Sequence, residues 1–216
     1  MKPKYALISW ALMAAFLLMM GCGPKPIKQE SILDNPDVHY NQGLRELDKG
    51  NFENAESEFN RALALDPNYA QGFAGLALTY AMKKDFKQAR EFADKGISKD
   101  GKNVDVRVAK GRVLTMERKG DSWIKDAVKE FDNALKINPN SDKAEYFKGE
   151  AYKTALMFDE AASSFRKVIA LKGDFAAQAN AQWELVQKIQ RAAPGTKVGA
   201  EIALIEQIDR ADVAVL

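Results

Sequence analysis

The sequence predicts an all-α fold in which about four helix pairs stack into a solenoid, with a capping helix after the last pair. In residues 55–67, Ala55, Phe59 and Ala62 are spaced three and four apart, so their side chains share one helix face. The helix is expected to end before Pro67, because proline lacks a backbone N–H and its ring clashes with the preceding turn. Similar sequence patterns begin at Ala89, Ala127 and Ala161, so the leading alanines are spaced 34, 38 and 34 residues apart. A period of this size is typical of solenoids.

Each period divides into two helical patterns. In the first period a helix begins at Pro36, a turn follows at Gly50-Asn51, and a second helix covers residues 52–65. The same division places the repeats at residues 36–69, 70–103, 104–141 and 142–175, with an extra helix over 175–192. The second repeat has Ala93 and Gly96 where the others have larger or helix-favouring residues. We therefore expect its seam, meaning the packed contact between its helices and their neighbours, to be the weakest packed.

The helix pairs resemble the tetratricopeptide repeat. The first pair has the signature of that family at Gly43, Gly50, Phe52, Ala55, Phe59, Ala62 and Pro67. The resemblance implies a right-handed α-solenoid whose concave groove, lined by the first helix of each repeat, binds a peptide or helix of another protein. The groove positions of the family fall here on Tyr40, Leu44, Leu78, Met82, Val108, Arg112, Met116, Tyr146, Glu150, Lys153, Asn180 and Glu184.

These positions are apolar in the N-terminal half and charged in the C-terminal half, which favours a partner segment with the same polarity. We expect a third to a half of them to be buried between repeats instead. The resemblance does not extend to the chaperone-binding members, which hold a C-terminal carboxylate with Lys and Asn. The matching positions here cannot hold a carboxylate by charge, since they are Tyr40, Leu44, Gly75, Asp105 and Ala109.

The first residues predict an exported protein. Lys2 and Lys4 precede the apolar run of residues 6–20, which is shorter than the roughly 20 residues of a membrane-spanning helix. Residues 19–22 (Met-Met-Gly-Cys) are similar to the lipobox of bacterial lipoproteins, with Met19 where Leu is usual. The resemblance implies cleavage of residues 1–21, a covalent lipid on Cys22 and, with Gly23 next, sorting to the periplasmic face of the outer membrane. The alternative is an uncleaved N-terminal anchor. Residues 22–35 then form a flexible tether.

The tail, residues 193–216, departs from the repeat. Residues 209–216 are faintly similar to the start of an S-layer homology module, which implies binding of a cell-wall polymer. The alternative interpretation is a cap over the last apolar seam.

Charge and motif content favour a protein-binding role over catalysis. The chain carries 32 Lys and Arg against 30 Asp and Glu, and the excess lies at Lys2 and Lys4, so no basic surface for nucleic acid is predicted. No phosphate-binding loop, nucleophile motif or metal-ligand spacing occurs in the sequence, and the single histidine, His39, is expected to pack between helices. We therefore expect no enzyme activity and no cofactor or metal besides the lipid on Cys22.

Two functions fit these expectations. The first is a lipid-anchored periplasmic adaptor that binds proteins through its groove and supports assembly of an envelope, pilus or secretion complex, as pilotins of this layout do. The alternative is a cell-wall-associated anchoring protein that uses its C-terminal tail.

Overall fold

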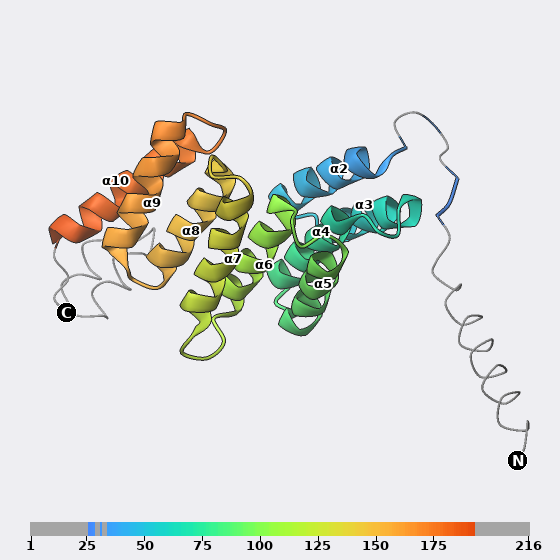
Figure 1. The fold of residues 1–216 in the computed structure, drawn as a ribbon, viewed down its shortest axis with the longest axis horizontal. Coiled ribbons are helices and arrows are strands. Elements are labelled where there is room, and N and C mark those ends of the chain that lie inside the picture. The colour runs from blue at the N-terminus through green and yellow to red at the C-terminus, as the bar shows by residue number, and fades with distance from the viewer. Residues whose placement is uncertain (1–25, 29–30, 32–33, 193–216) are drawn as a thin grey trace, which may run out of the picture.

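A computed structural model describes residues 26–28, 31 and 34–192, and its helices form one continuous array (Figure 1). In chain order the helices of the described residues are α2 (Pro36–Asp48), α3 (Phe52–Leu65), α4 (Ala70–Met82), α5 (Phe86–Lys99), α6 (Val104–Glu117), α7 (Trp123–Ile137), α8 (Asp142–Thr154), α9 (Phe158–Leu171) and α10 (Ala176–Ala192). None of these helices is long and apolar enough to cross a membrane. The predicted signal segment, Cys22 and the tail from residue 193 lie outside the described residues.

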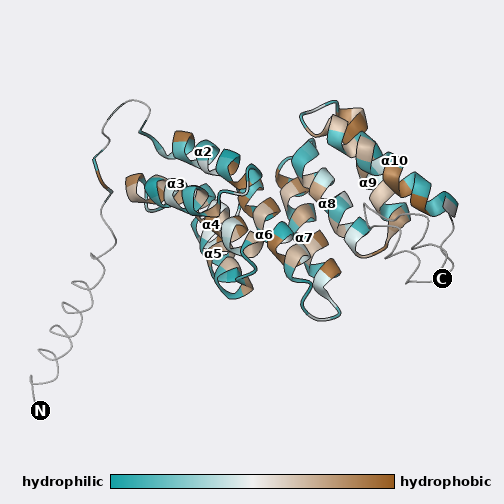
Figure 2. Ribbon diagram, turned by 180° about the vertical axis from the view of Figure 1, so that it is seen from behind, coloured by the Kyte–Doolittle hydropathy of each residue, from teal (hydrophilic) through white to brown (hydrophobic). Residues whose placement is uncertain are grey.

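The helices pack in two layers. Each first helix packs against its own second helix, in the pairs α2/α3, α4/α5, α6/α7 and α8/α9, and α10 packs against α9. The first helices also contact one another in sequence, from α2 through α4 and α6 to α8 and α10, so they form one continuous side of the array. This arrangement confirms the predicted all-α solenoid. Brown and teal residues alternate along most helices in Figure 2, as expected for helices that bury one face.

A phenylalanine facing a glycine fills the seam in three of the four pairs. Phe59, on α3, is fully buried, and a Cβ added to Gly43 or Gly75 would lie 2.5 or 2.3 Å from its ring. A Cβ on Gly111 would lie 2.7 Å from the ring of Phe131, and Gly149 stands in the same relation to Phe165. The glycines are therefore required by the close approach of each ring to the neighbouring helix backbone.

The second repeat closes its seam in another way. Ala93 and Gly96 are buried, and a Cβ on Gly96 would meet Val106 Cγ1 at 3.2 Å, so the helices have moved together rather than left a gap. The ring of Phe92 stacks on Tyr80 with centroids 5.3 Å apart, which adds apolar contact beside the small residues. Small side chains here therefore permit a close backbone approach, and the expectation that this seam is the weakest packed stays a prediction.

Side-chain caps begin several of the helices, and residues with positive φ end several turns. Asn35, Asn103 and Ser141 accept hydrogen bonds from the first free backbone N–H groups of α2, α6 and α8. After the first helices of repeats two to four, the chain turns through residues with positive φ, at Lys84, Arg118 and Leu156. In the first repeat, the turn between α2 and α3 has a glycine with positive φ, Gly50.

Candidate functional site

The continuous side formed by α2, α4, α6, α8 and α10 carries all twelve predicted groove residues, but it does not expose them equally. Tyr40, Leu78 and Val108 are buried, which is a smaller share than the third to a half expected. Exposed side chains are Met82, Asn180 and Glu184. The remaining six are partly buried: Leu44, Arg112, Met116, Tyr146, Glu150 and Lys153.

The two tyrosines among these residues are held by aromatic packing. Tyr40 lies against Phe59 and Tyr69, with ring centroids 5.9 and 6.1 Å away, and burial raises the pKa of its hydroxyl above the ordinary value. Tyr146 packs with Phe165 and Phe175, and burial raises its pKa to about 12. Both hydroxyls therefore stay neutral at physiological pH.

One pocket opens in the middle of this side, where the C-terminal ends of α4, α6 and α8 converge. It has a volume of about 530 Å³, and we call it the central pocket. Four predicted groove residues meet there: Met82, Arg112, Met116 and Glu150. The residues that sequence reasoning missed are Ala81, Lys84, Phe86, Thr115, Arg118, Phe147 and Thr154.

The missed residues fall into two groups, one in turns and one on helices. Lys84 and Arg118 belong to the turns after α4 and α6, and their positive φ values of 63 and 50° place them at the rim of the central pocket. Both were missed because the family's groove positions lie on first helices and include no turn residue. Four others lie on first helices but outside the family's groove positions, namely Ala81, Thr115, Phe147 and Thr154. A signal was present nonetheless, because the family's turn glycine is replaced by Lys84 in this chain.

Arg112 differs from the other charged side chains of α6. Its guanidinium carbon lies 4.1 Å from the centroid of the Phe147 ring, which is a cation–π contact between α6 and α8. Within the described part of the chain it has no hydrogen bond and no ion pair. By contrast, Arg107 donates to Glu130 at 2.7 Å, and Lys110 lies 2.9 Å from Asp94.

Burial lowers the pKa of Arg112, and the charge of Asp48 acts on it through space in the opposite direction. Arginine keeps its proton at any physiological pH. The central pocket therefore contains a permanent positive charge that has partly lost its water and has gained no carboxylate in exchange.

The polar groups around Arg112 already have partners. The Glu150 carboxylate accepts from Lys153 Nζ at 3.0 Å, and Lys153 also donates to Gln182 at 2.5 Å, which joins α8 to α10. The hydroxyls of Thr115 and Thr154 donate to backbone carbonyls of their own helices, at 2.9 and 2.8 Å.

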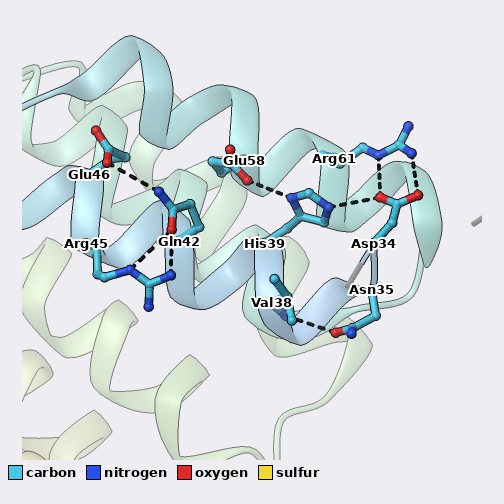
Figure 3. Close-up of polar contacts among 9 residues, drawn as sticks. All are labelled: Asp34, Asn35, Val38, His39, Gln42, Arg45, Glu46, Glu58 and Arg61. Carbon is cyan, nitrogen blue, oxygen red and sulfur yellow. Dashed lines mark hydrogen bonds and ion pairs between the residues drawn. The ribbon is translucent and has the colours of Figure 1, made fainter. Parts of the chain in front are cut away.

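A second polar cluster lies at the N-terminal end of the array (Figure 3). Arg61 donates two hydrogen bonds to Asp34, at 2.9 and 2.6 Å, and His39 Nε2 lies 2.9 Å from the same carboxylate. On its other side His39 Nδ1 lies 2.6 Å from Glu58. His39 therefore joins α2 to α3, the helix-packing role expected for it, and the described residues contain no group of three potential metal ligands.

Comparison with known proteins supports the repeat assignment. Residues 40–103 match the model of the tetratricopeptide repeat family. A curated relative, anaphase-promoting complex subunit 3 of Schizosaccharomyces pombe, is 27% identical over 119 residues, which is 53% of this chain and 17% of that protein. The chain thus spans less than a fifth of the length of this relative.

Solved structures share the fold. PilF of Pseudomonas aeruginosa is 21% identical, with a TM-score of 0.57 and coverage of 78% of this chain and 72% of that one. A thermophilic tetratricopeptide repeat protein of Thermus thermophilus is 15% identical, with a TM-score of 0.58 and coverage of 77% and 95%. At these identities the likeness extends to the fold, a scaffold suited to protein binding.

Proposed function

We propose that this protein is a lipid-anchored adaptor of the bacterial envelope, which holds a segment of another protein against the side formed by its first helices. The observation that carries the proposal is the central pocket, which three successive repeats build on that side and which exposes Met82 beside Met116. Methionine side chains are flexible and polarizable, so they adapt to irregular apolar partners. The lipobox-like residues 19–22 support the lipid anchor and the envelope location.

The role is non-enzymatic in this proposal. Glu150 of the central pocket bonds to Lys153, the Thr115 hydroxyl bonds to helix backbone, and none of the lining residues forms an acid–base pair with a nucleophile among the described residues. A groove of this kind acts by positioning its partner, and lipidation at Cys22 would restrict that action to the membrane surface. We propose assembly of an envelope, pilus or secretion complex as the process served.

Photocrosslinking tests the groove. A photoreactive residue at Met82 or Met116 should capture an envelope protein in living cells. Leu171, on α9 in the other layer, is 37% exposed, as is Met82, and provides the matched control. Capture of the same proteins from Leu171, or of none from Met82 and Met116, would contradict a groove adaptor.

The anchor is tested separately. Cys22→Ser should abolish incorporation of labelled palmitate and release the protein from the outer-membrane fraction, because no other cysteine is present. Retention of the variant in that fraction with unchanged labelling would contradict lipidation at Cys22.

A further inference from the structure

We propose that the central pocket binds an acidic side chain, Asp or Glu, in an apolar stretch of the partner, and that Arg112 is the residue that holds its carboxylate. This inference rests on the proposed protein-binding function and adds the chemistry of the segment bound. Its basis is the contrast between Arg112, which lacks a hydrogen-bond partner in the described part of the chain, and the bonded side chains of Glu150, Thr115 and Thr154 beside it.

The N–H donors of Arg112 are not used within the described residues. Its guanidinium carbon lies over the Phe147 ring, 4.1 Å from the centroid, and none of its five N–H donors meets an acceptor there. The ring thus holds the guanidinium in the pocket without a hydrogen bond. A carboxylate can accept two parallel N–H bonds from a guanidinium, an arrangement that is both directional and strong.

The charge of the pocket selects against other groups. Its lining contains three cations, Lys84, Arg112 and Arg118, none of which has an ion pair among the described residues. The one carboxylate of the lining, Glu150, already bonds to Lys153. The pocket therefore presents unpaired positive charge and no free carboxylate, which favours an acidic group over a basic one.

The apolar part of the lining determines what must flank the acid. Ala81, Met82, Phe86 and Met116 belong to the same pocket, and the hydroxyls of its threonines are bonded to helix backbone. A purely acidic segment would leave this surface uncovered, whereas an apolar residue beside the carboxylate would bury it. Removing water from around Arg112 would in turn strengthen its bond to the carboxylate.

The position of the pocket favours an internal segment over a chain terminus. The central pocket lies on α4, α6 and α8, and the same side of the array continues to α2 in one direction and to α10 in the other. A partner segment that passes through the central pocket can contact the first helices on both sides of it. Arg112 is also outside the five positions at which chaperone-binding relatives would hold a terminal carboxylate.

Peptide selection on the full-length protein tests the proposal. A random linear peptide library, displayed on phage, is selected on the wild type, on Arg112→Gln and on Arg166→Gln. Arg166 is an exposed arginine of α9 outside the pocket, so it serves as the matched control. The wild type and Arg166→Gln should enrich Asp or Glu next to apolar residues, and Arg112→Gln should lose that enrichment. Equal acidic enrichment on all three proteins would overturn the proposal, as would selection of peptides without acidic residues by the wild type.

Affinity measurements on one selected peptide then isolate the contact. By fluorescence anisotropy, Arg112→Gln should weaken binding about 10- to 100-fold, the effect of losing a hydrogen bond to a charged group. Replacing the acidic residue of the peptide with its amide should weaken binding to the wild type as much, and this arm is independent of whether the variant folds. Amidation of the peptide C-terminus should change nothing, and a large loss there would instead identify a terminal carboxylate and refute the internal segment. If Arg112→Gln leaves affinity unchanged while crosslinking from Met82 still captures a protein, the inference fails and the adaptor function stands.

Discussion

Substituting Gly111 with alanine tests how the repeats are held together. Within a helix, alanine is favoured over glycine by about 0.8–1 kcal/mol, so propensity alone predicts a more stable protein. At this position, however, the added Cβ would lie 2.7 Å from two ring atoms of Phe131, a side chain with no exposed surface. Overpacking of this kind costs about 1–3 kcal/mol, and the short contact indicates the upper part of that range. We therefore expect a net loss of about 1–2 kcal/mol.

Urea denaturation followed by circular dichroism measures this loss. Gly96→Ala provides a graded comparison, because its Cβ would meet Val106 at 3.2 Å and should be tolerated better. The double variant Gly111→Ala/Phe131→Leu should be more stable than the sum of the two single effects, since a smaller side chain makes room for the new methyl group. A Gly111→Ala protein as stable as the wild type, or more so, would refute the packing argument.

Three further predictions concern other parts of the array. Phe59→Ala should lower the free energy of unfolding by about 3–5 kcal/mol in the same assay, because a fully buried ring leaves a cavity, and an unchanged urea midpoint would contradict this. Lys84→Gly should stabilise the protein by about 0.5–1 kcal/mol, since glycine has φ near +63° without the strain that lysine bears there; a lower thermal midpoint would count against it. Tyr80→Phe should raise the pKa of Glu56 toward 4.5, because the tyrosine hydroxyl donates to that carboxylate at 2.7 Å. A carboxyl group whose pKa is lower in the folded than in the unfolded protein stabilises the fold at pH values above the unfolded pKa, and this stabilisation is lost as the pH falls through the folded pKa. The variant should therefore lose less stability on acidification below pH 4.5. NMR titration measures the pKa, and acid denaturation measures the stability.

The fold could be predicted because its signals are local and repeated. Helical spacing around Phe59 and Phe131, and prolines after their helices, specify where each second helix lies and which side it buries. The structure of the second repeat could not be read in this way. The absence of bulk at Ala93 is visible in the sequence, but whether neighbouring helices move together or leave a gap depends on contacts with Val106, from the next repeat.

The candidate site was predictable only in part, for a related reason. A family position identifies Arg112 as lying on the groove side, yet its lack of an ion pair is a property of all the side chains around it. Lys110 and Arg107 of the same helix find carboxylates on α5 and α7, whereas Arg112 faces Phe147 of α8. Sequence spacing gives the face of a residue but not the identity of what it meets across the groove.

The bond between Asp34 and Arg61 has a mechanical consequence. A force applied to the chain before residue 34 would otherwise unwind α2 one turn at a time from its N-terminal end. Because Asp34 is bonded to α3 through Arg61, and His39 joins the same carboxylate to α2, the force is shared between the two helices from the start. We propose that the protein is held to a membrane by its N-terminus, so tension between the membrane and a bound partner would pass through the first repeat. The force needed to separate α2 from α3 then sets the tension that the protein withstands before it unfolds.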